Sequence, residues 1–179
     1  LVPNPERILY VPAAMDAGFS IDEIFEATYI DRWFLREIDA LRTLRDRIAG
    51  QPLAALDPTL LREAKRAGLT DAHIARLVSP AVGELDVRAH RLGLGVRAVY
   101  SRVDTCAGEF PAYTPYLYSN YESLCEAEPS ERRKVMVLGS GPNRIGQGIE
   151  FDYCCVHASM AFQELGYETI MVNCNPETV

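Results

Sequence analysis

Apolar residues recur at steps of three and four through the first half of the chain, which is the spacing of amphipathic helices. The clearest stripe is expected in a helix that begins after Asp31, and its members are Phe34, Ile38, Leu41, Leu44 and Ile48. Short helices of this kind are stable only when their apolar faces pack on one another or on a partner. The pattern therefore predicts a helical domain without an obvious catalytic motif.

Capping residues, prolines and glycines set the expected helix boundaries. Starts are expected at Asn4-Pro5, Ser20, Asp31, Asp57-Pro58 and Thr70, and stops at Gly18, Gly50 and Gly68. Pro12 falls inside the first helix and predicts a kink or a break there, because proline removes one intrahelical hydrogen bond. The boundaries within 78–92 stay open, since Pro80 and Gly83 interrupt the periodicity.

Helical periodicity fades from position 93 onward, and aromatic residues accumulate. They are Tyr100, Phe110, Tyr113, Tyr116, Tyr118 and Tyr121. We expect this segment to run extended over other elements with its rings as anchors, although a stacking platform for a ligand is an alternative. Residues 122–133 are polar and contain Pro129, which is typical of a linker.

The pattern changes again at Lys134. Residues 134–139 form a short apolar run that ends in glycine, as expected of a fully buried parallel strand. A glycine-rich loop over 139–148 precedes apolar residues at helical spacing up to Leu165, and a second strand is expected over 168–173. The fold class is therefore α+β, with an all-α domain followed by the first βαβ unit of a Rossmann-like domain.

The glycine-rich loop completes neither of two familiar phosphate motifs. The dinucleotide fingerprint G-x-G-x-x-G needs an earlier third glycine, and the P-loop needs a lysine where Gln147 stands after Gly146. What remains is a glycine turn before a helix. Such a turn either binds an anion through its free N–H groups or lets the backbone pack closely.

Composition narrows the function classes further. The chain has 179 residues, with 18 Lys and Arg against 25 Asp and Glu, and a formal charge of −7. This acidity argues against a nucleic-acid partner, and no apolar run approaches the roughly 20 residues of a membrane helix. The five cysteines form no C-x-x-C pair, so we expect reduced thiols in a soluble cytoplasmic chain. Cys154 and His157 lack the second pair that a metal site needs.

Three carboxylates are better candidates for ligand contact. Glu150 and Asp152 follow the glycine loop, and Glu177 follows the second strand, so all three are expected near the carboxyl edge of the parallel sheet. Ligands of α/β proteins usually bind at that edge. For Asp152, capping of the helix is the alternative.

Two stretches closely resemble the large subunit of carbamoyl phosphate synthetase. Residues 141–154 read GPNRIGQGIEFDYC, and residues 173–179 read NCNPETV. Five shorter segments upstream also resemble the sequences of that family: 4–8, 30–34, 61–65, 102–106 and 112–116. The resemblance therefore covers essentially the whole chain.

The resemblance implies a domain plan and a parent enzyme. A helical oligomerisation domain with an extended aromatic tail is expected over 1–121, a linker over 122–133, and an incomplete pre-ATP-grasp βαβ unit over 134–179. The parent is expected to be an ATP-dependent carbon–nitrogen ligase that makes carbamoyl phosphate for arginine and pyrimidine synthesis from bicarbonate, ammonia from glutamine and two ATP. Its cofactors would be ATP with Mg²⁺ or Mn²⁺, and K⁺, and none is expected to bind this segment.

The resemblance also implies partners and a role. The expected partners are the remainder of the large subunit, the glutaminase small subunit and a second copy bound through the helical domain. Positions that match Gly148, Glu150 and Glu177 line a carbamate tunnel in the family, whereas no catalytic, cofactor-binding or metal residue is expected here, and the segment alone is expected to be inactive. Two alternatives stay open: a free-standing helical interaction module with a vestigial nucleotide fold, and a small dinucleotide-binding protein.

Overall fold

The computed structural model of the chain describes residues 4–139 and 148–172, and in the second range it describes side chains from Tyr153 onward. The chain divides into two compact units, Leu1–Ala127 and Glu128–Val179. The first unit is mainly helical and also carries one small antiparallel sheet, whereas the second contains a parallel strand pair and a helix.

Short helices make up most of the first unit. They are α1 (Arg7–Asp16), α2 (Ile21–Thr28), α3 (Arg32–Ile48), the 3₁₀ turn η1 (Leu53–Ala55), α4 (Pro58–Arg66), α5 (Asp71–Leu77) and α6 (Glu84–Gly93). The caps expected at Ser20, Asp31, Asp57 and Thr70 are confirmed, since each side chain accepts a hydrogen bond from a backbone N–H in the first helical turn. None of the helices in the described ranges has the length and apolarity needed to cross a bilayer.

The first helix differs from the expectation in two ways. It begins at Arg7 rather than directly after Asn4. It also continues through Pro12 to its end at Asp16, so of the two expected outcomes the break was wrong, and the kink stays a prediction. The neighbouring Val11 is buried, and its packing helps to offset the hydrogen bond that proline removes.

Helix α3 joins two separate hydrophobic clusters. A small cluster contains Val11, Met15, Ile24 and Leu35. A larger cluster contains Leu44, Ile48, Leu56, Leu60, Leu61, Ala64, Leu69, Ile74, Ala75, Val78, Val87 and Val96. Leu35 and Leu44 are about half a helical turn apart in angle, so the helix buries opposite sides at its two ends. The single stripe predicted from the sequence was therefore wrong: Phe34 is 56% exposed and Leu41 is 42% exposed.

The aromatic segment after α6 forms a β-hairpin. Strand β1 (Val99–Arg102) pairs antiparallel with β2 (Leu117–Asn120), with Val99 opposite Asn120 and Arg102 opposite Leu117. Farther along, the backbone N–H of Glu126 donates to the carbonyl of Tyr100 at 2.7 Å. The extended backbone was predicted, but its pairing into a hairpin was not.

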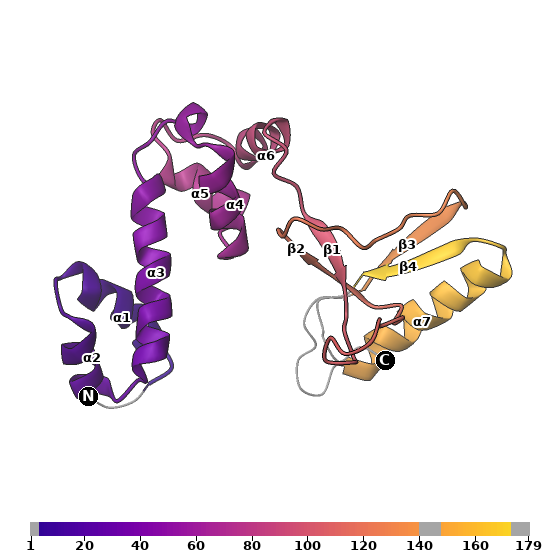
Figure 1. Cartoon of the computed structure of the whole chain (residues 1–179), viewed down its shortest axis with the longest axis horizontal. Helices are drawn as coiled ribbons and strands as arrows, with labels where there is room; N and C mark the ends of the chain where they lie inside the picture. The colour runs from indigo at the N-terminus through magenta and orange to yellow at the C-terminus, as the bar shows by residue number, and fades with distance from the viewer. Residues whose placement is uncertain (1–3, 140–147, 173–179) are drawn as a thin grey trace. The chain divides into compact units, whose positions relative to one another are not determined.

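The second unit contains the strand, helix and strand that the sequence predicts. Strand β3 (Lys134–Leu138), helix α7 (Gly148–Glu164) and strand β4 (Glu168–Val172) form a βαβ unit with parallel strands. Helix α7 packs along the strand pair (Figure 1). Full burial of β3 was a wrong expectation, because Met136 is 59% exposed and Leu138 is 73% exposed. Burial alternates along the strand, as it does where a helix covers only one face.

Candidate functional site

The residues predicted to line a tunnel follow the carboxyl ends of the two parallel strands. Gly148 is the first residue of α7 and Glu150 lies in its first turn, but the side chain of Glu150 and the whole of Glu177 lie outside the described residues. Leu138 stands opposite Val172 in the strand register, so the segments that carry these residues leave the same edge of the sheet. Their role at that edge stays a prediction.

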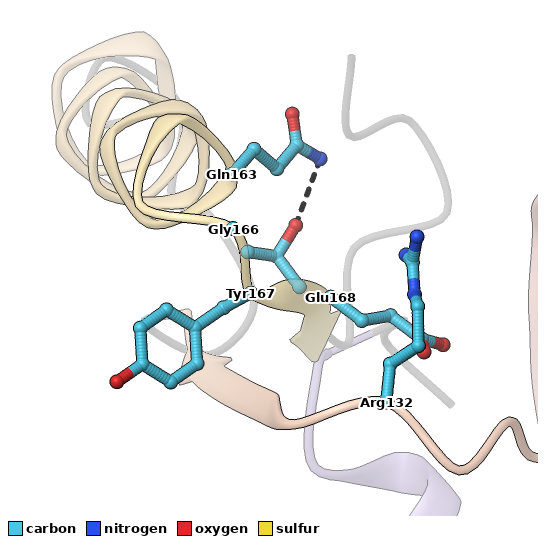
Figure 2. Close-up of a pocket in the computed structure, with 6 residues that line it drawn as sticks. Arg132, Gln163, Gly166, Tyr167 and Glu168 are labelled. Atoms are coloured by element: carbon cyan, nitrogen blue, oxygen red, sulfur yellow. Dashed lines mark hydrogen bonds and ion pairs between the residues drawn. The ribbon is translucent and has the colours of Figure 1, made fainter.

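A shallow hollow of about 310 Å³ lies at the other end of the strand pair (Figure 2). It is lined by Arg132, Gln163, Gly166, Tyr167, Glu168 and Thr169. Gln163 Nε2 donates to Thr169 Oγ1 at 2.9 Å, and Glu168 accepts from Ser130 and Arg132. The hydrogen bond from Ser130 lowers the pKa of Glu168, as do the nearby charges of Lys134 and Arg132. These polar groups bind one another, and the hollow is opposite the usual ligand edge, so it is the weaker candidate.

Cys154 and His157, which are three residues apart in the sequence, both lie on α7. The ring of His157 packs against that of Tyr153 with centroids 4.1 Å apart and the ring planes tilted by 55°, and both Cys154 and Cys155 are free thiols. In residues 4–139 and 153–172, no group of three or more His, Cys, Asp or Glu side chains could hold a metal ion. The described contacts give His157 a packing role.

A buried ionic triad in the helical domain was not anticipated from the sequence. Asp71 at the start of α5 binds Lys65 of α4 and Arg91 of α6. Lys65 Nζ lies 2.9 Å from Asp71 Oδ1, while Arg91 Nε lies 3.0 and 2.9 Å from the two carboxylate oxygens. All three side chains are about nine-tenths buried. Two buried cations therefore share one carboxylate.

The environment of the triad keeps Asp71 ionised. Burial alone would raise the pKa of Asp71, but the hydrogen bonds from Arg91 and Lys65, together with their charges, lower it by more. The net result is a pKa below the ordinary value. In the sequence, Asp71 directly follows the N-cap Thr70 and resembles an ordinary first-turn acid, so no local signal reveals contacts between three helices.

Two pairs of aromatic rings lie where α2 meets α3; Tyr29, Trp33 and Phe34 are exposed, whereas Phe25 is half-buried. We name Phe25, Tyr29, Trp33 and Phe34 the aromatic corner. Tyr29 is 79% exposed, Trp33 59% and Phe34 56%. Trp33 and Phe34 pack edge to face with centroids 5.0 Å apart, and Phe25 and Tyr29 do so at 5.9 Å. Exposed apolar surface of this kind on a folded domain indicates a protein interaction site.

Further large apolar side chains are exposed on α1, on α3 and on the turn between α1 and α2. They are Ile8, Leu9, Tyr10, Phe19 and Leu41. The helical unit thus combines a larger and a smaller internal cluster with several exposed apolar side chains at its amino-terminal end. It is followed in the chain by the opening strand, helix and strand of a parallel α/β domain. This combination defines the class: a helical domain followed by a parallel βαβ unit.

The comparisons with known protein families are specific. Residues 1–95 match the model of the carbamoyl-phosphate synthetase large chain, oligomerisation domain. Residues 131–179 match the model of the carbamoyl phosphate synthase preATP-grasp domain. The chain therefore belongs to the family of carbamoyl phosphate synthase large chains.

Individual relatives agree with the family models. The chain is 56% identical over 177 residues to the carbamoyl phosphate synthase large chain of Neisseria meningitidis serogroup A, and 57% identical over 177 residues to that of Haemophilus ducreyi. It is 55% identical over 178 residues to that of Pseudomonas aeruginosa. Each match covers 99% of this chain and 16% of the relative, so the chain spans about one sixth of their length.

Proposed function

We propose that the chain acts as an oligomerisation and scaffolding segment of a carbamoyl phosphate synthase large chain. The whole protein would make carbamoyl phosphate from bicarbonate, ammonia from glutamine and two ATP, with Mg²⁺ or Mn²⁺ and K⁺, in complex with a glutaminase small subunit. Identity of 55–57% across nearly the whole chain supports this activity. The nucleotide and metal sites of the reaction are proposed to lie elsewhere in the large chain.

The observation that carries the scaffolding role is the exposed aromatic corner. It lies within residues 1–95, the part that matches the oligomerisation model. Trp and Tyr are enriched among the few side chains that contribute most of the binding energy of protein interfaces. We therefore propose that the partner is a second copy of the chain and that Trp33 contacts it.

A pair of matched variants tests this proposal. Trp33 and Leu85 are each the second residue of a helix, and both are exposed, Leu85 by 73%. A glutamate at that position suits the helix dipole in both cases. Trp33→Glu is expected to weaken self-association by about thirty-fold or more, because it removes a ring and places a charge in the interface. Leu85→Glu is expected to leave it unchanged, as measured by sedimentation velocity.

Two results would count against the aromatic corner as the interface. One is equal self-association of the Trp33→Glu variant and the unmodified chain. The other is an equal loss in both variants, since that would indicate a general effect of added charge. Far-ultraviolet circular dichroism of each variant establishes that the helices are intact before the comparison is made.

We also propose that Gly148, Glu150 and Glu177 line part of a carbamate tunnel in the whole enzyme. A glycine leaves space for a passage, and carboxylates offer hydrogen-bond acceptors to a labile polar intermediate. In the full-length enzyme, Gly148→Phe is expected to spare the separate ATP-consuming half-reactions but to suppress overall carbamoyl phosphate formation. Steady-state assays of each partial reaction and of the overall synthesis measure the difference. Equal loss of every partial activity would contradict the tunnel role.

A further inference from the structure

Both ends of the β1–β2 hairpin meet the helical core at one side chain, Arg91. Val96, which precedes β1, is fully buried, and its carbonyl accepts a hydrogen bond from Arg91 Nη1 at 3.0 Å. Tyr121 directly follows β2, and its ring centroid lies 5.8 Å from Arg91 Cζ. A single guanidinium group therefore contacts the chain where it enters the hairpin and where it leaves.

The ionic triad holds Arg91 in this position. Asp71 binds Arg91 and also Lys65, whose Nζ lies 5.5 Å from the centroid of the same Tyr121 ring. The face of an aromatic ring attracts cations, and the attraction strengthens when the charges are shielded from water. Tyr121 is half-buried against the larger hydrophobic cluster. The ring is thus held by apolar packing and by two cations.

A second set of contacts continues from the ring to the hairpin. Arg66, next to Lys65 on α4, donates through Nε to the carbonyl of Tyr121 at 3.3 Å and forms an ion pair with Glu122. The N–H of Glu122 donates to the side-chain oxygen of Asn120 at 2.8 Å. Asn120 in turn donates to the hydroxyl of Ser101 at 2.7 Å, which links β2 to β1. The contacts run without interruption from the helices into both strands.

We propose that Tyr121 and Glu122, held by Lys65, Arg66 and Arg91, form a latch that fixes the hairpin onto the helical domain. An isolated two-stranded hairpin is marginally stable in water, so this one depends on its attachment. Opening the latch would release the hairpin and the segment that follows residue 122, while the helices keep their own buried clusters. Tyr121 is therefore a positioning residue that sets the path by which the chain leaves the helical domain.

Amide hydrogen exchange of the whole 179-residue chain tests the latch. Tyr121→Leu is expected to raise the exchange rates of the β1 and β2 amides by about ten-fold, because loss of the ring removes its contacts with both cations. The amides of α3 are expected to exchange at unchanged rates. Tyr121→Phe keeps the ring and should retain most of the protection. Tyr113→Leu, at a loop residue that is 88% exposed, serves as the control and should change neither region.

A milder variant keeps the proposal testable if Tyr121→Leu fails to fold. Glu122→Gln removes only the exposed ion pair with Arg66, and we expect it to raise hairpin exchange by about two-fold. The latch would be overturned if exchange in β1 and β2 stayed at the unmodified rate in both variants. It would also be overturned if exchange rose equally in the hairpin and in α3, since that would reflect general destabilisation.

Discussion

Replacing Asp71 with Asn is expected to lower the free energy of unfolding by about 3–5 kcal/mol at neutral pH. The amide would leave Lys65 and Arg91 buried without a counter-charge, although it fills nearly the same volume. Both cations are about nine-tenths buried, so water cannot readily replace the lost carboxylate. Urea denaturation followed by circular dichroism measures the change in stability.

An exposed ion pair provides the control for this substitution. Arg47 and Glu63 lie 2.7 Å apart, but about half of each side chain is exposed. Glu63→Gln is therefore expected to cost less than about 1 kcal/mol, because solvent screens such pairs. A cost below about 1 kcal/mol for Asp71→Asn as well would show that the triad contributes little to stability.

The stability that Asp71→Asn removes is expected to depend on pH. The pKa of Asp71 is lower in the folded chain than its ordinary value of about 3.9. Its contribution to stability is therefore fully present above that value and is lost as the pH falls through the folded-state pKa. The difference in stability between the unmodified chain and the Asp71→Asn variant should be largest near pH 7 and should narrow below about pH 4. A difference that widened on acidification would contradict the assignment.

Leu61→Ala is expected to lower the free energy of unfolding by about 2–5 kcal/mol. Leu61 is fully buried in the larger hydrophobic cluster, so the truncation leaves a cavity. Leu85→Ala, at a side chain that is 73% exposed, should change stability by less than about 0.5 kcal/mol.

Two probes of the Leu61→Ala variant also test the role of α3. Trp33 is the single tryptophan of the chain and lies at the start of α3, while Leu44 and Ile48 at the other end lie in the larger cluster. If α3 couples the two clusters, tryptophan fluorescence and circular dichroism should show the same transition, shifted together by the substitution. A fluorescence transition that stayed at its unmodified midpoint would mean that the two clusters unfold independently.

Local chemistry explains which parts of the fold could be predicted from the sequence. The capping box of Ser20 and Glu23 needs only residues three positions apart, and both of its hydrogen bonds are present. The parallel βαβ unit was also predictable, because its apolar runs and glycines have the required order and length. The capping box depends only on neighbours in the chain, and the βαβ unit follows from the order of its elements, although its two strands pair over a distance of 34 residues.

Features that depend on distant contacts could not be predicted in the same way. The stripe through α3 failed because the helix packs into one cluster at Leu35 and into another at Leu44, on opposite sides. The hairpin was missed because the fourteen residues between β1 and β2 leave no short turn signal between the strands. The ionic triad was missed because Lys65, Asp71 and Arg91 come from three helices.

Among the candidate functional residues, too, some could be placed from the order of the sequence, whereas others depend on tertiary packing. Sequence order alone places Gly148 and Glu150 after one strand and Glu177 after the next, so their shared edge of the sheet could be predicted. Their part in a tunnel came from the resemblance and stays a prediction. The aromatic corner could not be predicted from the sequence. Phe34 was expected in the core, and only tertiary packing leaves it exposed.

The central claim is that the helical domain binds a second copy of the chain. Sedimentation equilibrium of the unmodified chain tests this claim most directly. We expect the average mass to rise above 19.9 kDa as the concentration increases from low micromolar to hundreds of micromolar. A mass that stayed at 19.9 kDa over the whole range would contradict the proposed scaffolding role.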